Sequence, residues 1–317
     1  MDWIGKQISM YAGRGVYQTN VSLSIQLKSE ISSVTMKPGR SSRTAVFVCM
    51  GRAVAHGMTT ESRFSDPTAL ALLPDDARSL VERLHSGAAP KGIRGLLDHT
   101  YIDRLSKVMV ARTVAIDDAV RDVHSPQLVI LGAGLDGRAW RIPELGETTV
   151  FEVDHPDTQR EKRERVAALA QAARDVRFAP VDFTRDNLDD ALTAAGHDQA
   201  SATTWIWEGV VMYLTPAEIK ATLAVIERRA AAGSRLIVVY HSPSPVLPLV
   251  GFVVRRLGEP LRSAFTPDAM RDLLARYGFG VLWDADMPAI GGAMSAEIAR
   301  ATRMIKHLRI VVADRIE

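Results

Sequence analysis

The sequence predicts an α/β protein built on a doubly wound, mostly parallel sheet, and two observations support this. Between Gln127 and Asp154 a short apolar run breaks into the glycine turn Gly132-Ala133-Gly134-Leu135-Asp136-Gly137, and a second apolar run ends in an acid. Beyond this stretch, strand-like apolar runs keep alternating with helix-like segments, as in repeated βαβ units. A unit made of a strand, a glycine turn, a helix and a second strand is typical of proteins that bind a nucleoside cofactor. The cofactor lies at the carboxyl ends of the strands.

Bulk composition describes an ordinary globular protein. The chain has 317 residues, of which 47% are hydrophobic and 24% charged. Lys and Arg number 39 against 37 acids, so the formal charge of +2 gives no electrostatic reason to expect nucleic acid. The single cysteine, Cys49, excludes an intramolecular disulfide and a cysteine-based zinc site, and we expect no metal. No apolar run has the length of a signal peptide or a membrane span, so we expect a cytoplasmic protein without a membrane partner.

The first part of the chain is expected to be helical after an irregular extension. Residues 1–40 show no sustained period and predict a loosely ordered extension, within which Met36 is an alternative start. Helix-like spacing of apolar residues then follows. The predicted helices are 42–56, one that begins at Asp66-Pro67, and 101–120.

After the glycine turn, strands and helices are expected to alternate. The predicted strands are 128–131, 149–153, 176–181, 203–207 and 234–240, and the predicted helices are 137–141, 156–173 and 215–231. A proline-rich apolar segment at 243–263 breaks this rhythm and predicts a lid over the strand ends. Later, we expect helices at 266–278 and 295–308, and strands at 281–284 and 309–312 that could pair.

Three acids follow consecutive predicted strands: Asp154, Asp182 and Glu208. The carboxyl ends of parallel strands share one rim, so these carboxylates should face one crevice. S-adenosylmethionine carries a sulfonium, an ammonium and a ribose, which suit an acidic rim, whereas a dinucleotide brings a pyrophosphate that such a rim would repel. Taken singly, each acid could be a helix cap. Together they favour S-adenosylmethionine, although the turn also satisfies the dinucleotide motif G-x-G-x-x-G.

These motifs resemble the leucine carboxyl methyltransferase family, especially its bacterial branch of polyketide O-methyltransferases and actinobacterial methyltransferases. The resemblance covers roughly residues 42–279. The Val-Asp-His-Pro block and the Glu-Gly-Val-x-Met-Tyr-Leu block are its specific parts. The matching segments are 111–113 with 116–117, 129–138, 151–156, 180–183 and 207–214.

The resemblance implies a class I methyltransferase (Rossmann-like) fold. This fold has a seven-stranded, mostly parallel sheet with its last strand antiparallel, N-terminal helices and an inserted lid, here within a methyltransferase domain at 41–317. By this resemblance, Arg112 would bind the carboxylate of the methionine arm, Glu208 would bind its ammonium, and Gly132 and Gly134 would let the backbone approach it. Asp154 would bind the ribose, and Asp182 and Phe183 would bind the adenine. One departure is Gly137, where the family usually has a small polar residue.

The predicted function is S-adenosyl-L-methionine-dependent O-methyl transfer to a small-molecule acceptor. The apolar lid favours a largely apolar acceptor. A carboxylate acceptor needs no base, whereas a hydroxyl is helped by one, for which Tyr213 and His241 are the candidates. The sequence does not decide between a carboxylate acceptor and a hydroxyl acceptor. The alternatives are an NAD-type oxidoreductase on a similar βαβ unit and an inactive module that only binds the cofactor.

Overall fold

The computed structural model describes residues 42–87, 92–183, 185–245, 247–248 and 260–316. The predicted extension at 1–40 and most of the predicted lid at 243–263 therefore lie outside the described residues.

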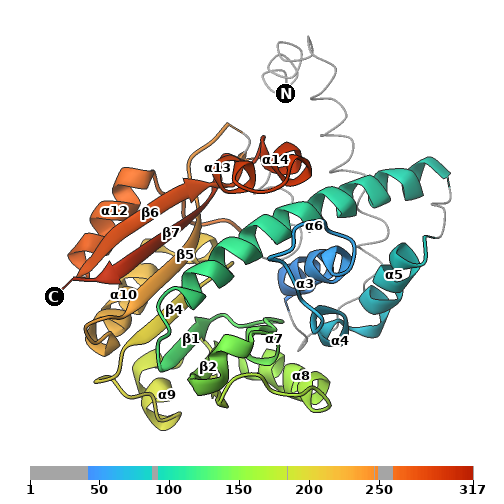
Figure 1. Ribbon diagram of the computed structural model, residues 1–317. Coiled ribbons are helices and arrows are strands. Elements are labelled where there is room, and N and C mark those ends of the chain that lie inside the picture. The colour runs from blue at the N-terminus through green and yellow to red at the C-terminus, as the bar shows by residue number, and fades with distance from the viewer. Residues whose placement is uncertain (1–41, 88–91, 184, 246, 249–259, 317) are drawn as a thin grey trace, which may run out of the picture.

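A seven-stranded sheet in the order β3-β2-β1-β4-β5-β7-β6 forms the centre of the molecule (Figure 1). Strands β1 to β5 pair in parallel, and β7 runs antiparallel to both β5 and β6. This topology confirms the predicted class I methyltransferase fold. The strands are β1 Gln127–Leu131, β2 Thr149–Asp154, β3 Asp175–Pro180, β4 Thr203–Trp207, β5 Arg235–His241, β6 Phe279–Asp286 and β7 Leu308–Arg315.

Helices cover both faces of the sheet, and each face has its own apolar core. The core on the first face continues into the helices beside the sheet. Its helices are α3 Arg43–Ala55, α4 Ala69–Leu72, α5 Asp75–His85, α6 Gly92–Arg121, α7 Arg138–Arg141, α8 Pro156–Val166, α13 Met287–Gly292 and α14 Ala296–Thr302. The second face packs against α9 Leu188–Ala194, α10 Pro216–Arg229 and α12 Pro267–Arg276. Two 3-10 turns, η1 Pro143–Glu147 and η2 Val211–Tyr213, complete the set.

The central strands are apolar on both sides because both faces are covered. All five residues of β4 are buried. Trp205 and Trp207 point into the second core, while Ile206 between them belongs to the first. The two tryptophans are therefore core residues.

Several helix predictions were wrong in extent, and three helices were not predicted. Helix α6 begins at Gly92 instead of 101, and the helix predicted from Asp66-Pro67 begins at Ala69 as α4. Helix α8 ends at Val166 instead of 173, because the backbone N–H groups of Ala172 and Ala173 turn back to the carbonyl of Ala139. Helix α14 ends at Thr302 instead of 308. Helix α5 was not predicted, nor were α9, which Asn187 caps, and α13, which Asp286 caps. Each cap is an Asx residue just before the helix, a recognised start signal.

Within the described part of the chain, no helix combines the length and apolar character that crossing a membrane requires.

Candidate cofactor and acceptor site

The glycine turn after β1 requires glycine at two positions. Gly132 has a φ of +70° and Gly134 a φ of +47°, both in the left-handed region. A Cβ on Gly132 would lie 2.2 Å from Cγ2 of Val210, so a side chain is also excluded by packing. The backbone N–H of Gly132 donates to the carbonyl of Val153 at 2.8 Å. The turn is thereby held against the end of β2.

Asp154 closes β2 and faces this turn. Its Oδ2 accepts the N–H of Gly134 at 2.5 Å, and its Oδ1 accepts the N–H of His155 at 2.6 Å. Burial raises the pKa of Asp154, and the two backbone N–H donors oppose that rise. Each oxygen keeps further lone-pair capacity, since an ionised carboxylate has about four acceptor sites. This arrangement fits a pair of ribose hydroxyls.

Glu208 and Arg112 meet at the end of β4. Glu208 follows the last residue of the strand, and Arg112 reaches it from α6, with 2.7 Å between Nε and Oε1. The Nε–H of Arg112 is buried and has no aligned hydrogen-bond acceptor. Burial alone would raise the pKa of Glu208, but the guanidiniums of Arg112 and Arg138 lower it below its ordinary value. The two side chains therefore present a positive and a negative group side by side, which fits an amino-acid zwitterion.

Asp182 and Phe183 follow β3, one strand beyond Asp154. The N–H of Asp182 donates to Oδ2 of Asp186 at 2.8 Å, and its carboxylate lies 3.5 Å from Nε of Arg185. Phe183 packs against the second core. Because Asp154 pairs with Pro180 in the sheet, these residues continue the same rim.

The structure thus brings the seven predicted cofactor residues to one rim formed by neighbouring strands. The glycine turn follows β1, and the acids follow β2, β3 and β4, whose order in the sheet is β3-β2-β1-β4. Arg112 joins them from α6.

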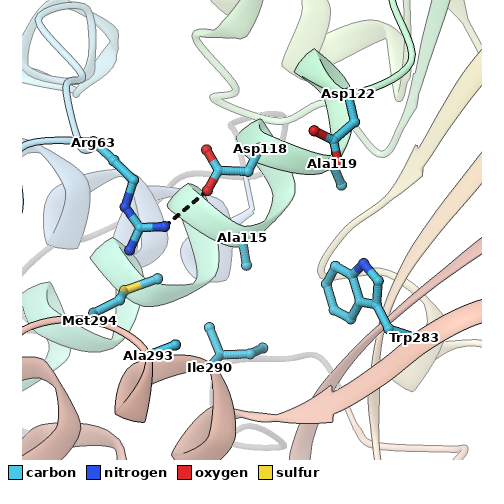
Figure 2. A pocket seen from close by; sticks show the side chains of 9 residues that line it. All are labelled: Arg63, Ala115, Asp118, Ala119, Asp122, Trp283, Ile290, Ala293 and Met294. Carbon is cyan, nitrogen blue, oxygen red and sulfur yellow. Dashed lines mark hydrogen bonds and ion pairs between the residues drawn. The ribbon is translucent and has the colours of Figure 1, made fainter.

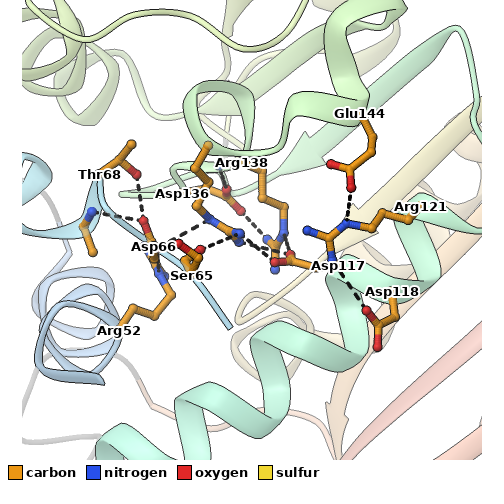
Figure 3. Close-up of polar contacts among 12 residues, drawn as sticks. Arg52, Ser65, Asp66, Thr68, Asp117, Asp118, Arg121, Asp136, Arg138 and Glu144 are labelled. Atoms are coloured by element: carbon orange, nitrogen blue, oxygen red, sulfur yellow. Dashed lines mark hydrogen bonds and ion pairs between the residues drawn. The ribbon is translucent and has the colours of Figure 1, made fainter. Parts of the chain in front are cut away.

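A buried ion-pair network behind the glycine turn was not predicted (Figure 3). Its centre is Arg138, which donates to Oδ1 of Asp117 at 2.7 Å and to Oε2 of Glu208 at 2.8 Å, and also pairs with Asp136. Asp117 also accepts from Arg141 at 2.6 Å. The guanidiniums belong to Arg52, Arg112, Arg138 and Arg141, and the carboxylates to Asp66, Asp117, Asp136 and Glu208.

Four positive and four negative groups therefore balance inside the protein, where each of these side chains is at most 12% exposed. The network joins the N-terminal helices to the glycine turn. Arg52 on α3 pairs with Asp66 at 2.8 Å and donates to the carbonyl of Leu135 at 2.6 Å. The sequence signal that could have found it is the group of one Asp and two Arg within the short segment 136–141.

Gly137, the departure noted in the sequence, has a packing role. A Cβ on Gly137 would lie 2.1 Å from Oγ1 of Thr68, which donates to Oδ1 of Asp66 at 2.7 Å. Gly137 therefore lets the segment before α4 approach the glycine turn.

The two predicted acceptor-side residues, Tyr213 and His241, lie near each other in the fold, because η2 packs against β5. Tyr213 ends η2, and His241 is the last residue of β5. His241 is buried, and its ring centroid lies 5.2 Å from that of His307, with 31° between the planes. Neither Nδ1 has a hydrogen-bond partner. Burial, His307 and Arg112 together lower the pKa of His241 to about 4. His307 was not predicted.

An open groove lies elsewhere, between α6, α13 and β6 (Figure 2). It encloses roughly 530 Å³, including space open to solvent. Arg63 and Asp118 line this groove, and Nη1 of Arg63 lies 3.2 Å from Oδ2 of Asp118. None of the predicted site residues lines it.

Among the described residues, no group of three or more His, Cys, Asp or Glu side chains could hold a metal ion.

The model of the leucine carboxyl methyltransferase family matches residues 45–227. The chain belongs to this family. Two relatives are named "putative S-adenosyl-L-methionine-dependent methyltransferase". The one from Mycolicibacterium gilvum is 32% identical over 233 residues, 69% of this chain and 72% of the relative. The one from Mycobacterium sp. (strain JLS) is 33% identical over 231 residues, 73% of this chain and 75% of the relative.

Solved structures agree on the fold. A DUF574 family protein from Streptomyces avermitilis gives a TM-score of 0.54 at 12% identity, covering 87% of this chain and 98% of that one. A "putative methyltransferase" from Thermobifida fusca gives 0.51 at 14% identity, covering 89% and 97%. With the family established, this leucine carboxyl methyltransferase family member is an S-adenosylmethionine-dependent methyltransferase. The dehydrogenase alternative is not favoured.

Proposed function

We propose that the protein transfers a methyl group to an oxygen atom of a small, largely apolar acceptor in the cytoplasm. The observation that carries the proposal is the adjacent pair of opposite charges, Arg112 and Glu208, on the same rim as Asp154. When bound, S-adenosylmethionine supplies a methyl group on a sulfonium, so that a new O–C bond forms as the C–S bond breaks to leave a neutral thioether. The chain's task is to align the reacting groups and exclude water.

In this proposal each rim residue holds one part of the cofactor. Arg112, whose Nε–H lacks an aligned acceptor, takes the methionine carboxylate, and Glu208 takes the ammonium. Gly132 and Gly134 allow the backbone to approach that arm, since neither carries a side chain. Asp154 accepts from the ribose hydroxyls.

Asp182 and Phe183 provide the adenine site, where Phe183 offers an aromatic face beside a polar edge. Residues 41–317 are the methyltransferase domain in this proposal, and 243–263 its lid. Arg262, near the end of the lid segment, donates its N–H to the carbonyl of Met212 at 2.7 Å, and this bond ties that end to η2.

Oxygen is the proposed acceptor atom because the family is named for carboxyl methylation and because Tyr213 and His241 stand on the acceptor side of the rim. Both side chains can hydrogen-bond an oxygen.

Calorimetric titration with S-adenosylhomocysteine and, separately, with NAD tests the cofactor assignment. We expect heat of binding with S-adenosylhomocysteine and none with NAD, because the acidic rim repels a pyrophosphate. No binding of S-adenosylhomocysteine would overturn the assignment.

A radiolabelled methyl donor then tests turnover. We expect label on the oxygen of a phenol, an alcohol or a carboxylic acid from a panel of apolar small molecules. Label found only on nitrogen or carbon acceptors would refute O-methylation, and binding without any transfer would identify the inactive module.

A further inference from the structure

We propose that His307 and His241 together bind the methyl acceptor through a hydroxyl group and that this imidazole pair takes the hydroxyl proton. The inference rests on the proposed function and narrows its acceptor class to phenols and alcohols.

The backbone fixes both histidines at the acceptor side of the rim. His241 ends β5, which pairs with β7, and in that register His241 lies opposite Leu308, the residue after His307. The N–H of Ser242 donates to the carbonyl of His307 at 2.7 Å, and the N–H of Phe265 donates to the carbonyl of His241 at 2.9 Å. These bonds bring the two rings together from positions 66 residues apart (307 − 241).

Both rings carry a nitrogen that the protein leaves unsatisfied. Nδ1 of His241 and Nδ1 of His307 are buried without a hydrogen-bond partner, and His241 is only 9% exposed. Leaving a buried polar atom unpaired costs about 1–3 kcal/mol, so two such atoms on rings in contact require an explanation. A ligand hydroxyl would satisfy them, because it can donate to one nitrogen and accept from the N–H of a ring.

The charge state of the pair suits a neutral acceptor. The ionisable neighbours that act on His241 are His307 before β7 and Arg112 on α6, and Arg112 is itself paired with Glu208. Burial also lowers the pKa of His307. Both rings are therefore neutral at pH 7, with one lone pair each available for an O–H donor.

The proton has a defined destination in this arrangement. As the O–C bond forms, the acceptor oxygen becomes a protonated ether, which is a far stronger acid than an imidazolium. Even a ring with a lowered pKa takes the proton from it, becoming an imidazolium that later releases the proton to water. A carboxylate acceptor has no proton to give and would gain nothing from the pair.

The test measures binding of phenol and of benzoate to the protein saturated with S-adenosylhomocysteine, with nitrogen-15 NMR of the histidine rings as the readout. We expect phenol to shift the ring signals of His241 and His307. His307→Asn and His241→Asn should each weaken phenol binding about tenfold. Binding of benzoate should change much less. His124→Asn, an exposed position with a φ of 45° that Asn tolerates, is the matched control and should change neither.

Three results would overturn the inference: no binding of phenol, equal phenol affinity in the wild type and both variants, or an equal loss for benzoate. Failure of the proposed function gives a different result, namely no binding of S-adenosylhomocysteine to the wild type. Retained affinity of each variant for S-adenosylhomocysteine shows that the variant is folded.

Discussion

The cofactor side and the acceptor side of the rim satisfy their polar groups in opposite ways. Behind the glycine turn, four guanidiniums meet four carboxylates in a buried network, centred on Arg138. At the end of β5 and just before β7, His241 and His307 each keep a buried Nδ1 with no partner. In the first region every charged group has an ion-pair partner within the protein, although Nε of Arg112 and Nε of Arg141 lack an aligned acceptor. In the second region the two rings have no charged partner among the described residues, and a ligand would complete them under the proposal above.

This difference separates a charged part of the site from a neutral one. Fixed charges with internal partners do not reorganise when a ligand arrives, so they suit a cofactor that is the same in every cycle. In the proposed acceptor site, the two neutral rings carry no fixed charge.

The largest expected effect comes from breaking the network at its centre. Arg138→Met removes one cation from three buried carboxylates: Asp117 keeps Arg141, Glu208 keeps Arg112, and Asp136 loses the ion pair described for it. We expect the free energy of unfolding to fall by about 3–5 kcal/mol, as when one partner of a buried pair is removed. Urea unfolding measures it.

The matched control is Arg160→Met, since Arg160 pairs with Asp157 at 2.7 Å but is 62% exposed. This variant should lose no more than about 1 kcal/mol, because water screens exposed pairs. Equal losses of unfolding free energy in the two variants would show that the buried network stabilises the protein no more than an exposed ion pair does.

Next, Asp154→Ala tests whether Asp154 binds the ribose of the cofactor. The variant should bind S-adenosylhomocysteine about 1–3 kcal/mol more weakly, the scale of lost charge-assisted hydrogen bonds. Calorimetry measures the change, and Asp157→Ala on the exposed start of α8 is the control. Unchanged affinity in Asp154→Ala would rule out the ribose role.

Gly137→Ala examines how tightly the N-terminal segment packs on the turn. The added methyl would meet Oγ1 of Thr68 at 2.1 Å, so we expect a loss of stability of about 1–3 kcal/mol. Thr68→Ala removes that oxygen, and the double variant should recover part of the loss relative to the sum of the single variants. Strict additivity in thermal or urea unfolding would show that the two sites do not touch.

The dependence of stability on pH tests the state of His241 on the acceptor side. The pKa of His241 is lowered to about 4 in the folded protein, so between about pH 6.5 and 4 the unfolded chain binds its proton first. The free energy of unfolding should therefore fall as the pH falls through this window, by at most about 1.4 kcal/mol per pH unit for this histidine. His241→Asn should have a shallower slope in urea unfolding between pH 7 and 5, and His124→Asn should keep the wild-type slope.

The sequence predicted what local pattern controls. Strand positions follow from apolar runs, and the rim residues follow from motifs a few positions long, such as the glycine turn and the acid after β2. The network could not be predicted in this way, because Arg112 and Glu208 are 96 positions apart (208 − 112) and meet only through the packing of α6 on β4. His307 was missed for a similar reason, because the antiparallel pairing of β5 and β7 brings it to His241.

The distance in sequence between Arg112 and Glu208 also limits when their ion pair can form during synthesis of the chain. A ribosome adds about 5–20 residues per second, so the 96 residues from 113 to 208 take on the order of 5–20 s. During that interval α6 has left the ribosome, yet Arg112 lacks the carboxylate it is buried with. The charge pairing of Arg112 can therefore be completed only after Glu208 has been synthesised, although α6 is made first.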